Sequence, residues 1–192
     1  MKPAACLIAL LLTLSSAACA IPTPRHSFQP QGATSIRVAQ SVWSDDRLDS
    51  TSIITRAEDI HSTELQVEHA VEDGLSLVAG IGTRNYQFEE LDDFQTFETT
   101  LGFRSYALPF HEHLIGYFGL GARYGDLPGS EYSVDIDSSF GLVVPFESLH
   151  LDINLTSGLS VAGDGDIPFL ENFERNHLLL SIGVGWSFGS GN

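Results

Sequence analysis

The sequence predicts an all-β protein, more specifically an eight-stranded antiparallel up-and-down β-barrel that crosses a membrane. Three observations lead to this fold class. Apolar and polar residues alternate along most of the chain beyond residue 34, glycine and serine are concentrated on the polar face, and short connections alternate with longer ones. Alternation with a period of two is typical of strands whose two faces meet different surroundings.

The first 20 residues have the features of a secretory signal peptide. Lys2 supplies a positive charge, residues 5–14 form an apolar run, and small residues follow as far as Ala20. The apolar run is shorter than the roughly 20 residues of a membrane-spanning helix. No later run approaches that length, so we expect no transmembrane helix.

Two processing sites remain open at the end of this segment. Ala18-Cys19-Ala20 fits signal-peptidase cleavage, whereas residues 16–19 are similar to a lipobox, after which Cys19 would be acylated. Cys6 lies in the removed segment, so the mature chain keeps Cys19 or no cysteine. We therefore expect no disulfide, thiolate metal site or cysteine nucleophile.

Residues 21–34 are expected to form a periplasmic linker, because they contain three prolines and a glycine and show no periodicity. The formal net charge of the whole chain is −16. Such a chain is not expected to bind nucleic acid, since phosphate binding requires clustered lysine and arginine. The acidic surface serves solubility, or else acidic loops bind the divalent cations found at a lipopolysaccharide surface.

The alternation is clearest in the last three strands expected, residues 130–144, 149–161 and 178–188. One face of the final strand is apolar and the other consists of small residues: Leu178, Leu180, Ile182, Val184, Trp186 and Phe188 against Ser181, Gly183, Gly185 and Ser187. Five earlier segments show a noisier alternation: residues 36–43, 63–71, 75–86, 97–106 and 114–124. The total is eight strands, each close to the roughly 9–11 residues that cross a bilayer.

The glycines indicate which face is inside. Nine of them share the polar face: Gly80, Gly82, Gly102, Gly119, Gly121, Gly141, Gly158, Gly183 and Gly185. Glycine weakens a strand and packs nothing, but the narrow lumen of an eight-stranded barrel requires small residues. We therefore place the polar face inside, whereas a lipocalin-like barrel would have its apolar face inside.

Charges of both signs also lie on the polar face. Four arginines (Arg37, Arg84, Arg104, Arg123) accompany six carboxylates (Glu64, Glu68, Glu98, Asp135, Asp137, Asp152). A closed lumen requires such groups to be paired. The alternative is a solvated sheet face.

The connections fit the topology of outer-membrane barrels, with short periplasmic turns and longer extracellular loops. Residues 71–74 (with the turn signal Asp73-Gly74), 107–112 and 145–148 are short, whereas residues 44–62, 87–94, 125–129 and 163–176 connect the other ends. The third of these loops is hardly longer than the turns. Aromatic residues near the strand ends fit interfacial girdles: Phe97, Tyr124, Tyr132, Phe146, Trp186 and Phe188.

The C-terminal segment resembles the assembly signal of outer-membrane barrels, a polar residue, a glycine and two alternating aromatics that end the last strand. Residues 181–188 carry this pattern, and a tail at 189–192 follows. The chain is thus similar to the small eight-stranded OmpA/OmpX-like barrels over residues 35–188. The resemblance implies an outer-membrane location and recognition of the last strand by the barrel-assembly machinery.

Several polar clusters are candidate chemical sites. His111-Glu112-His113 offers two imidazoles to a metal but lacks a third ligand at a known spacing. His150 is expected to join an interior network with Asp152. His61 and Ser62, with Asp59 nearby, suggest a lipid A acyltransferase or deacylase, but adjacent strand residues point to opposite faces.

Loop carboxylates are candidate calcium or magnesium ligands: Asp45, Asp46, Glu89, Glu90, Asp92, Asp93, Asp164 and Asp166. A solvated acidic surface is the simpler interpretation. No P-loop, dinucleotide-binding fingerprint or zinc spacing occurs. We therefore assign no catalytic, cofactor-binding or metal-binding residues.

The sequence thus predicts a monomeric barrel of the cell outer membrane with a structural or surface-interaction role and no open general-diffusion pore. The expected partners are outer-membrane lipid, lipopolysaccharide and the assembly machinery. A lipid A-modifying enzyme, a narrow pore and a soluble or lipid-anchored lipocalin-like binding barrel are the alternatives.

Overall fold

The computed structural model describes residues 30–44, 59–87, 93–111, 113–127, 131–163 and 177–188. They form eight strands: β1 (Thr34–Ser44), β2 (Asp59–Glu72), β3 (Leu75–Gln87), β4 (Phe94–His111), β5 (Leu114–Leu127), β6 (Glu131–Phe146), β7 (Leu149–Gly163) and β8 (His177–Phe188). No helix among these residues has the length and apolar character needed to cross a membrane.

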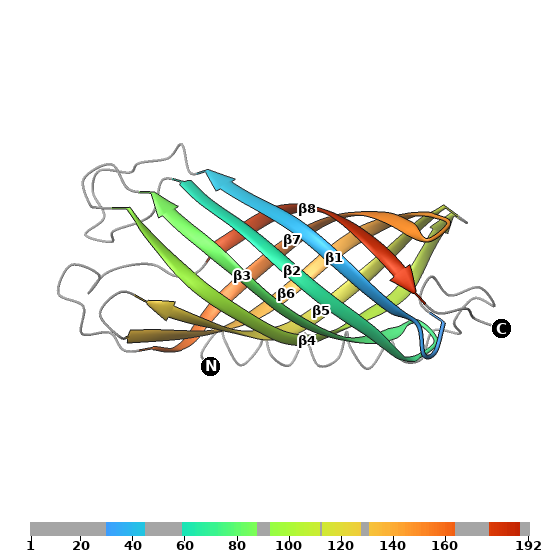
Figure 1. Cartoon of the computed structure of the whole chain (residues 1–192), viewed down its shortest axis with the longest axis horizontal. Helices are drawn as coiled ribbons and strands as arrows, with labels where there is room; N and C mark the ends of the chain where they lie inside the picture. Colours follow the sequence, from blue (N-terminus) through green and yellow to red (C-terminus); the bar gives the residue numbers. More distant parts are fainter. Residues whose placement is uncertain are drawn as a thin grey trace, which may run out of the picture.

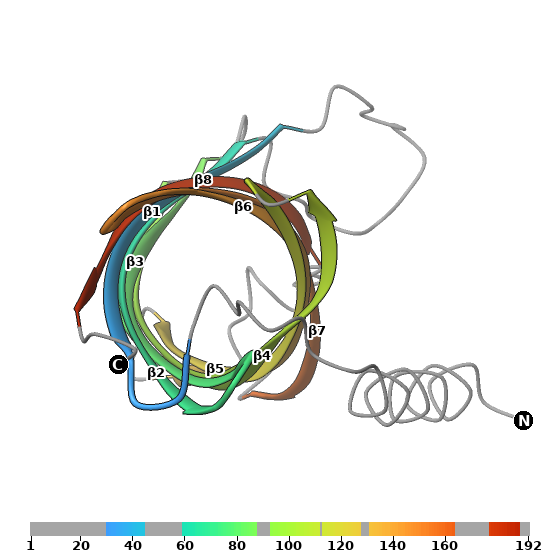
Figure 2. The ribbon, with the colours of Figure 1, turned by 90° about the vertical axis from the view of Figure 1, so that its right-hand side faces the viewer.

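The strands close into a barrel in which each one pairs antiparallel with its sequence neighbours (Figures 1 and 2). Closure is provided by β1 and β8, which pair from Thr34 opposite Phe188 to Val42 opposite Leu180. The predicted fold class is confirmed. We call the end with the three tight turns, the start of β1 and the end of β8 the turn end, and the opposite end the loop end.

Burial follows the alternation along the regularly paired parts of the strands. Along β8, Leu180, Ile182, Val184 and Trp186 are exposed on the outer wall, whereas the intervening residues are buried. The same pattern places most of the strand glycines, and the arginines with their carboxylate partners, inside. Most large apolar side chains therefore lie on the outside of the barrel, the reverse of a lipocalin-like arrangement.

Strand bounds differ from the predicted ones at several places. β4 continues to His111 through residues expected to turn, because register shifts after Ser105 and after Pro109 interrupt the alternation without ending the pairing. β5 extends to Leu127, inside the expected third loop. β2 begins at Asp59, so His61 and Ser62 lie within a strand. The eight strands are 11 to 18 residues long, longer than the minimum needed for a crossing.

The chain is tied to the β2–β3 turn before it enters β1. The backbone N–H of Gln31 donates to Asp73 Oδ1 at 2.7 Å, and its side-chain amide donates to the carbonyl of Val71 at 3.2 Å. The N–H of Gly32 donates to the carbonyl of Ala70 at 2.9 Å, with Gly32 at a φ of 84°. Glycine adopts such a φ without strain, which allows the close approach.

Candidate functional site

The interior of the barrel holds every arginine that the structure describes. Arg37, Arg84, Arg104 and Arg123 occupy inward positions of β1, β3, β4 and β5, and each is less than a tenth exposed. Six carboxylates share this interior, as predicted: Glu64, Glu68, Glu98, Asp135, Asp137 and Asp152. Since charges withdrawn from water must be paired to be tolerated, their arrangement decides whether the lumen is closed.

Two arginines and two carboxylates form a layer toward the turn end. Arg37 Nη1 lies 2.6 Å from Asp152 Oδ2, and Arg104 Nη1 lies 2.9 Å from Glu68 Oε2. Gln66 connects the pairs, because its Oε1 accepts hydrogen bonds from Arg37 at 2.5 Å and from Arg104 at 2.6 Å. We call these five residues the turn-end layer.

Two tyrosines hydrogen-bond to the carboxylates of the turn-end layer. The Tyr106 hydroxyl donates to Glu68 Oε2 and the Tyr117 hydroxyl donates to Asp152 Oδ1, each at 3.0 Å. The Arg104 guanidinium lies 4.9 Å from the centre of the Tyr117 ring, within cation–π range. Together with Val143 and Ile115, the tyrosines form an apolar cluster inside the turn end.

A second group of charges lies toward the loop end, centred on Arg123. Its Nε is 2.7 Å from Asp137 Oδ2, and its Nη1 is 2.7 Å from Glu98 Oε2. Glu64 contacts Arg123 at 3.8 Å and accepts a hydrogen bond from Thr100 at 2.5 Å.

Arg84 extends this second group. Its Nε lies 3.2 Å from Glu98 Oε1, and the side chain is fully buried. We call Glu64, Arg84, Glu98, Arg123, Asp135 and Asp137 the loop-end layer. An apolar cluster of Ile60, Tyr86 and Leu179, with Phe94 packed against it, also lies inside the loop-end half of the barrel.

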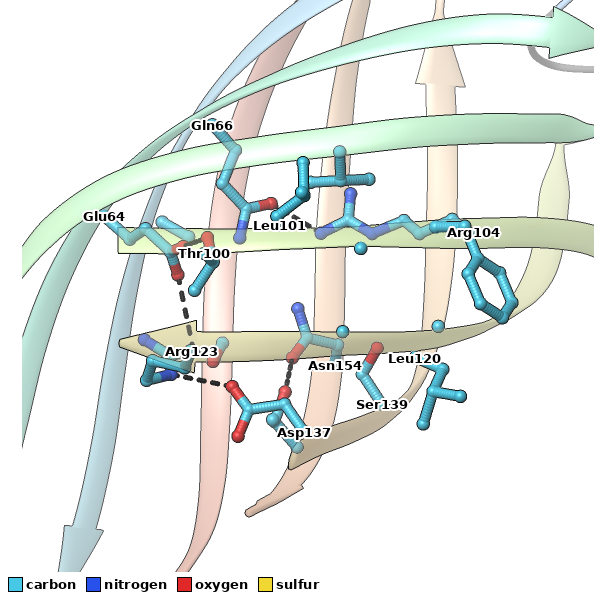
Figure 3. Close-up of a pocket in the computed structure, with 18 of the residues that line it drawn as sticks. Glu64, Gln66, Thr100, Leu101, Arg104, Leu120, Arg123, Asp137, Ser139 and Asn154 are labelled. Carbon is cyan, nitrogen blue, oxygen red and sulfur yellow. Dashed lines mark hydrogen bonds and ion pairs between the residues drawn. The ribbon is translucent and has the colours of Figure 1, made fainter. Parts of the chain in front are cut away.

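A cavity of about 70 Å³ lies between the two layers. Figure 3 shows Arg123 between Glu64 and Asp137 on one side of it, and Gln66 and Arg104 on the other. Such a volume holds on the order of two to four water molecules. The cavity is thus suited to hydrating the charged layers and is too small for an organic ligand.

The two layers differ in charge. The turn-end layer is balanced, with Arg37 and Arg104 against Glu68 and Asp152. The loop-end layer has two arginines against four carboxylates, so its formal charge is −2 with every group ionised. The loop-end half of the interior is therefore the more acidic half.

Glycines make room for the largest interior side chains. Gly141 pairs with Tyr117 across β5 and β6, and a Cβ at Gly141 would lie 2.6 Å from the tyrosine oxygen. Gly185 pairs with His150, and a Cβ there would overlap the imidazole. These two glycines thus provide the space for the side chains opposite them, whereas a Cβ at Gly82, Gly102 or Gly121 would first meet the backbone of a neighbouring strand.

The structure separates the catalytic candidates of the first loop. His61 is exposed on the outer wall, whereas Ser62 is buried inside the barrel. Ser62 pairs with Ser41 and Arg84, and His61 pairs with Val42 and Asn85. The two side chains are therefore on opposite sides of the wall, where the imidazole cannot activate the hydroxyl.

The remaining candidates have different outcomes. His150 is buried near the turn end, with its Nδ1 3.5 Å from the Ser187 hydroxyl. In the 111–113 motif, His113 is exposed and Glu112 lies outside the described residues. Asp93 is the one loop carboxylate among the described residues; Asp45, Asp46, Glu89, Glu90, Asp92, Asp164 and Asp166 lie outside them. Within the described ranges, no three His, Cys, Asp or Glu side chains are arranged to hold a metal ion.

The alternation does not reveal the apolar side chains inside the barrel. Ile60, Leu127, Val143 and Leu179 are all buried on the inner face. Leu179 lies between Leu178 and Leu180, both exposed, so its residue type gives no sign of its inner position. Only its place in the period of two, on the same face as Ser181, indicates that position, and its pairing with the inward Thr156 agrees with it.

No protein-family model matches the chain, and no curated protein matches it. Solved structures do match it. The N-terminal β-barrel domain of Pseudomonas aeruginosa OprF has a TM-score of 0.54 at 15% identity and covers 83% of this chain and 100% of its own. The outer membrane protein OprG from P. aeruginosa has a TM-score of 0.53 at 13% identity, with coverages of 84% and 98%.

Neisserial surface protein A is similar to the same extent, with a TM-score of 0.51, 14% identity and coverages of 81% and 96%. At these identities the likeness concerns the fold alone. That fold is the small barrel of outer-membrane proteins, which confirms the resemblance drawn from the sequence.

Proposed function

We propose that this protein is a monomeric outer-membrane barrel with a structural or surface-interaction role and no open general-diffusion pore. The observation that carries the proposal is the combination of an apolar outer wall with an interior occupied by two layers of arginine–carboxylate contacts. In hydrocarbon every backbone N–H and C=O must be paired, and a closed barrel meets that requirement. The loop end would then face outward and the turn end the periplasm.

The interior contacts support the absence of an open pore. Two layers of paired charges and two apolar clusters lie along the lumen. Eight strands leave an interior just wide enough for side chains. Purified protein in planar bilayers should therefore show no steady conductance of the size typical of porins, and a persistent open channel would contradict this part of the proposal.

The orientation is tested with single cysteines and a membrane-impermeant maleimide on intact cells. Gln87 ends β3 at the loop end and is exposed, and Glu147 lies in the exposed β6–β7 turn. Gln87→Cys should be labelled in intact cells, whereas Glu147→Cys should be labelled only after permeabilisation. The unsubstituted chain is the control, since any signal from Cys19 would appear there. The reverse pattern would overturn the proposed orientation.

We further propose a non-enzymatic role, supported by the placement of His61 and Ser62 on opposite sides of the wall. Lipid A from cells expressing His61→Ala or Ser62→Ala should match lipid A from cells with the unsubstituted chain. A change in acylation that depends on either side chain would support the lipid A-modifying alternative instead.

The partners follow from the proposed location. Outer-membrane lipid and lipopolysaccharide surround the wall, and the barrel-assembly machinery would recognise β8, whose last two outward residues, Trp186 and Phe188, stack with ring centres 6.3 Å apart. β1 and β8 pair with each other, so no strand edge among the described residues is open to a second copy. This closure supports the monomeric state.

A further inference from the structure

The apolar part of the outer wall is much shorter on one side of the barrel than on the other. On β3, the apolar outward residues end at Ile81, six residues beyond Leu75. On β7 they extend from Leu149 to Val161, a span of 12 residues that only Ser157 interrupts. With a rise of about 3.3 Å per residue and a tilt of about 45°, these spans cover roughly 14 Å and 28 Å of height.

The apolar band of an outer-membrane barrel is about 25 Å tall. The β7 side covers that band, whereas the β3 side falls short of it by about 10 Å. Polar outward residues occupy most of the missing height, with Val42 on β1 and Phe97 on β4 at its two borders. Gln40, Thr63 and Thr83 lie side by side across β1, β2 and β3, and His61, Asn85 and Gln95 form the next row across β2, β3 and β4. We call these six residues the outer polar patch.

All six side chains of the outer polar patch lie on the outer wall; five are exposed and Thr83 is partly exposed. They provide hydroxyl, amide and imidazole groups, which donate and accept hydrogen bonds. The described outer wall has no lysine or arginine, because the four described arginines are all inside. This chemistry fits the hydroxyl groups of a sugar and supplies none of the charge-assisted lysine or arginine contacts that bind a phosphate group most strongly.

The surroundings of the outer polar patch suit the rest of a glycolipid. On the turn-end side of the patch, Leu65 and Ile81 are exposed and continue the apolar wall that lipid chains would cover. Beside it, Phe97 is 53% exposed and pairs with Thr83, so an aromatic ring borders the hydroxyl groups.

We propose that the outer polar patch binds the headgroup sugars of a glycolipid of the lipopolysaccharide type in the outer leaflet. This inference rests on the proposed outer-membrane location, and it assigns a lipid-binding face to β1–β4. The headgroup would occupy the height that the short apolar wall leaves polar, with the acyl chains on Leu65 and Ile81.

The test compares lipid retention by native mass spectrometry of the purified full chain in detergent. The probes are rough lipopolysaccharide with inner-core sugars, lipid A without core sugars, and phosphatidylethanolamine. The patch variant is Thr63→Val with Thr83→Val, which exchanges two hydroxyls for methyl groups of similar volume. The control variant is Ser138→Ala with Ser157→Ala, which removes two outward hydroxyls that pair across β6 and β7 in the long apolar wall.

We expect the unsubstituted chain and the control variant to retain rough lipopolysaccharide in preference to lipid A. The patch variant should lose about tenfold in retention of rough lipopolysaccharide, the effect of two hydrogen bonds of ordinary strength. Its retention of lipid A and phosphatidylethanolamine should not change.

Three outcomes would overturn the inference. These are equal retention of rough lipopolysaccharide and lipid A by the unsubstituted chain, unchanged retention by the patch variant, or a dimer of the unsubstituted chain that the patch variant dissociates. The last outcome would make the face a protein interface. Fractionation of cells expressing each variant tests the outer-membrane location separately from the binding role of the outer polar patch. A barrel that reaches the outer membrane but does not distinguish the lipids contradicts only the binding role.

Discussion

At the scale of single residues, the interior depends on side chains that each satisfy several partners. Arg104 pairs with Glu68 at 2.9 Å, hydrogen-bonds Gln66 at 2.6 Å and lies over the Tyr117 ring. A second carboxylate, Asp152, lies 4.0 Å away. Removing this guanidinium leaves two buried carboxylates with less compensation, which is the situation in which a buried ion pair affects stability most.

Arg104→Ala is therefore expected to lower the free energy of unfolding by about 3–5 kcal/mol. Urea titration of the protein refolded in lipid vesicles, followed by tryptophan fluorescence, measures the loss. Asp126→Asn serves as the control, because Asp126 is exposed at the loop end and its neutralisation should change stability little. An Arg104→Ala protein as stable as this control would mean that the turn-end layer does not stabilise the barrel.

Glycine at position 141 has a specific role in holding Tyr117. The Tyr117 ring is fixed by its hydrogen bond to Asp152 and by Arg104, so it cannot easily move away from a new methyl group. Gly141→Ala should lower the free energy of unfolding by about 1–3 kcal/mol, the usual effect of overpacking.

Gly125→Ala is the comparison for Gly141→Ala. A Cβ at Gly125 would meet only the Ser133 hydroxyl at 2.8 Å, which can rotate. The same urea titration should show a smaller loss for Gly125→Ala, and equal losses for the two variants would contradict the role given to Tyr117.

At the scale of the elements, the turns at the turn end use two residues with positive φ. Gly74 in the β2–β3 turn has a φ of 77°, and Glu147 in the β6–β7 turn has a φ of 54°. Left-handed backbone is unfavourable for residues other than glycine by roughly 1–2 kcal/mol. We therefore expect that adding a side chain at Gly74 and removing the side chain of Glu147 change the free energy of unfolding in opposite directions.

Gly74→Ala should lower the free energy of unfolding by about 1 kcal/mol, and Glu147→Gly should raise it by a similar or smaller amount. Both are measured by the same urea titration. Destabilisation by Glu147→Gly would show that the carboxylate, and not the backbone conformation, determines the residue at that position.

The last strand is expected to matter for assembly more than for final stability. Phe188 is about half exposed on the outer wall and pairs with Thr34 where β8 closes the barrel. Phe188→Ala should reduce the amount of folded protein recovered from cell membranes, while the purified variant should refold in detergent in the same yield as the unsubstituted chain. Leu178→Ala, at the other end of the same face, is the control. Equal recovery of both variants from cells would argue against recognition of the C-terminal aromatic.

Much of this element structure is predictable from the sequence. Alternation locates all eight strands and assigns the inner and outer faces, and paired charges together with glycines on one face indicate which is inside. The bounds of β4 are not predictable, because the register shifts after Ser105 and Pro109 break the period of two. The period of two assigns Leu179 to the inner face, but a leucine at that place is not predictable from a face that otherwise carries serine and glycine.

The contacts inside the barrel depend on register, which one sequence does not specify. The four arginines and six carboxylates could be named in advance, but their division into a balanced turn-end layer and an acidic loop-end layer follows from strand stagger. The outer polar patch is not predictable from the sequence for the same reason. Gln40, Thr63 and Thr83 are distant in the chain and become neighbours only through pairing.

At the scale of the whole molecule, the protein is a closed barrel with an apolar exterior and an interior that holds arginines and carboxylates. The apolar exterior makes an aqueous environment unfavourable for the folded protein, because apolar side chains on every strand would contact water. Closure leaves no strand with unpaired backbone groups, so detergent and lipid would stabilise the folded barrel rather than unfold it.

The most direct test of this account is fractionation of expressing cells, followed by SDS gels of heated and unheated samples. We predict recovery in the outer-membrane fraction and a different mobility for the unheated band, because a closed barrel resists SDS until heat opens it. Recovery in the soluble periplasm, with the same mobility before and after heating, would contradict the account and place the apolar side chains around a ligand instead.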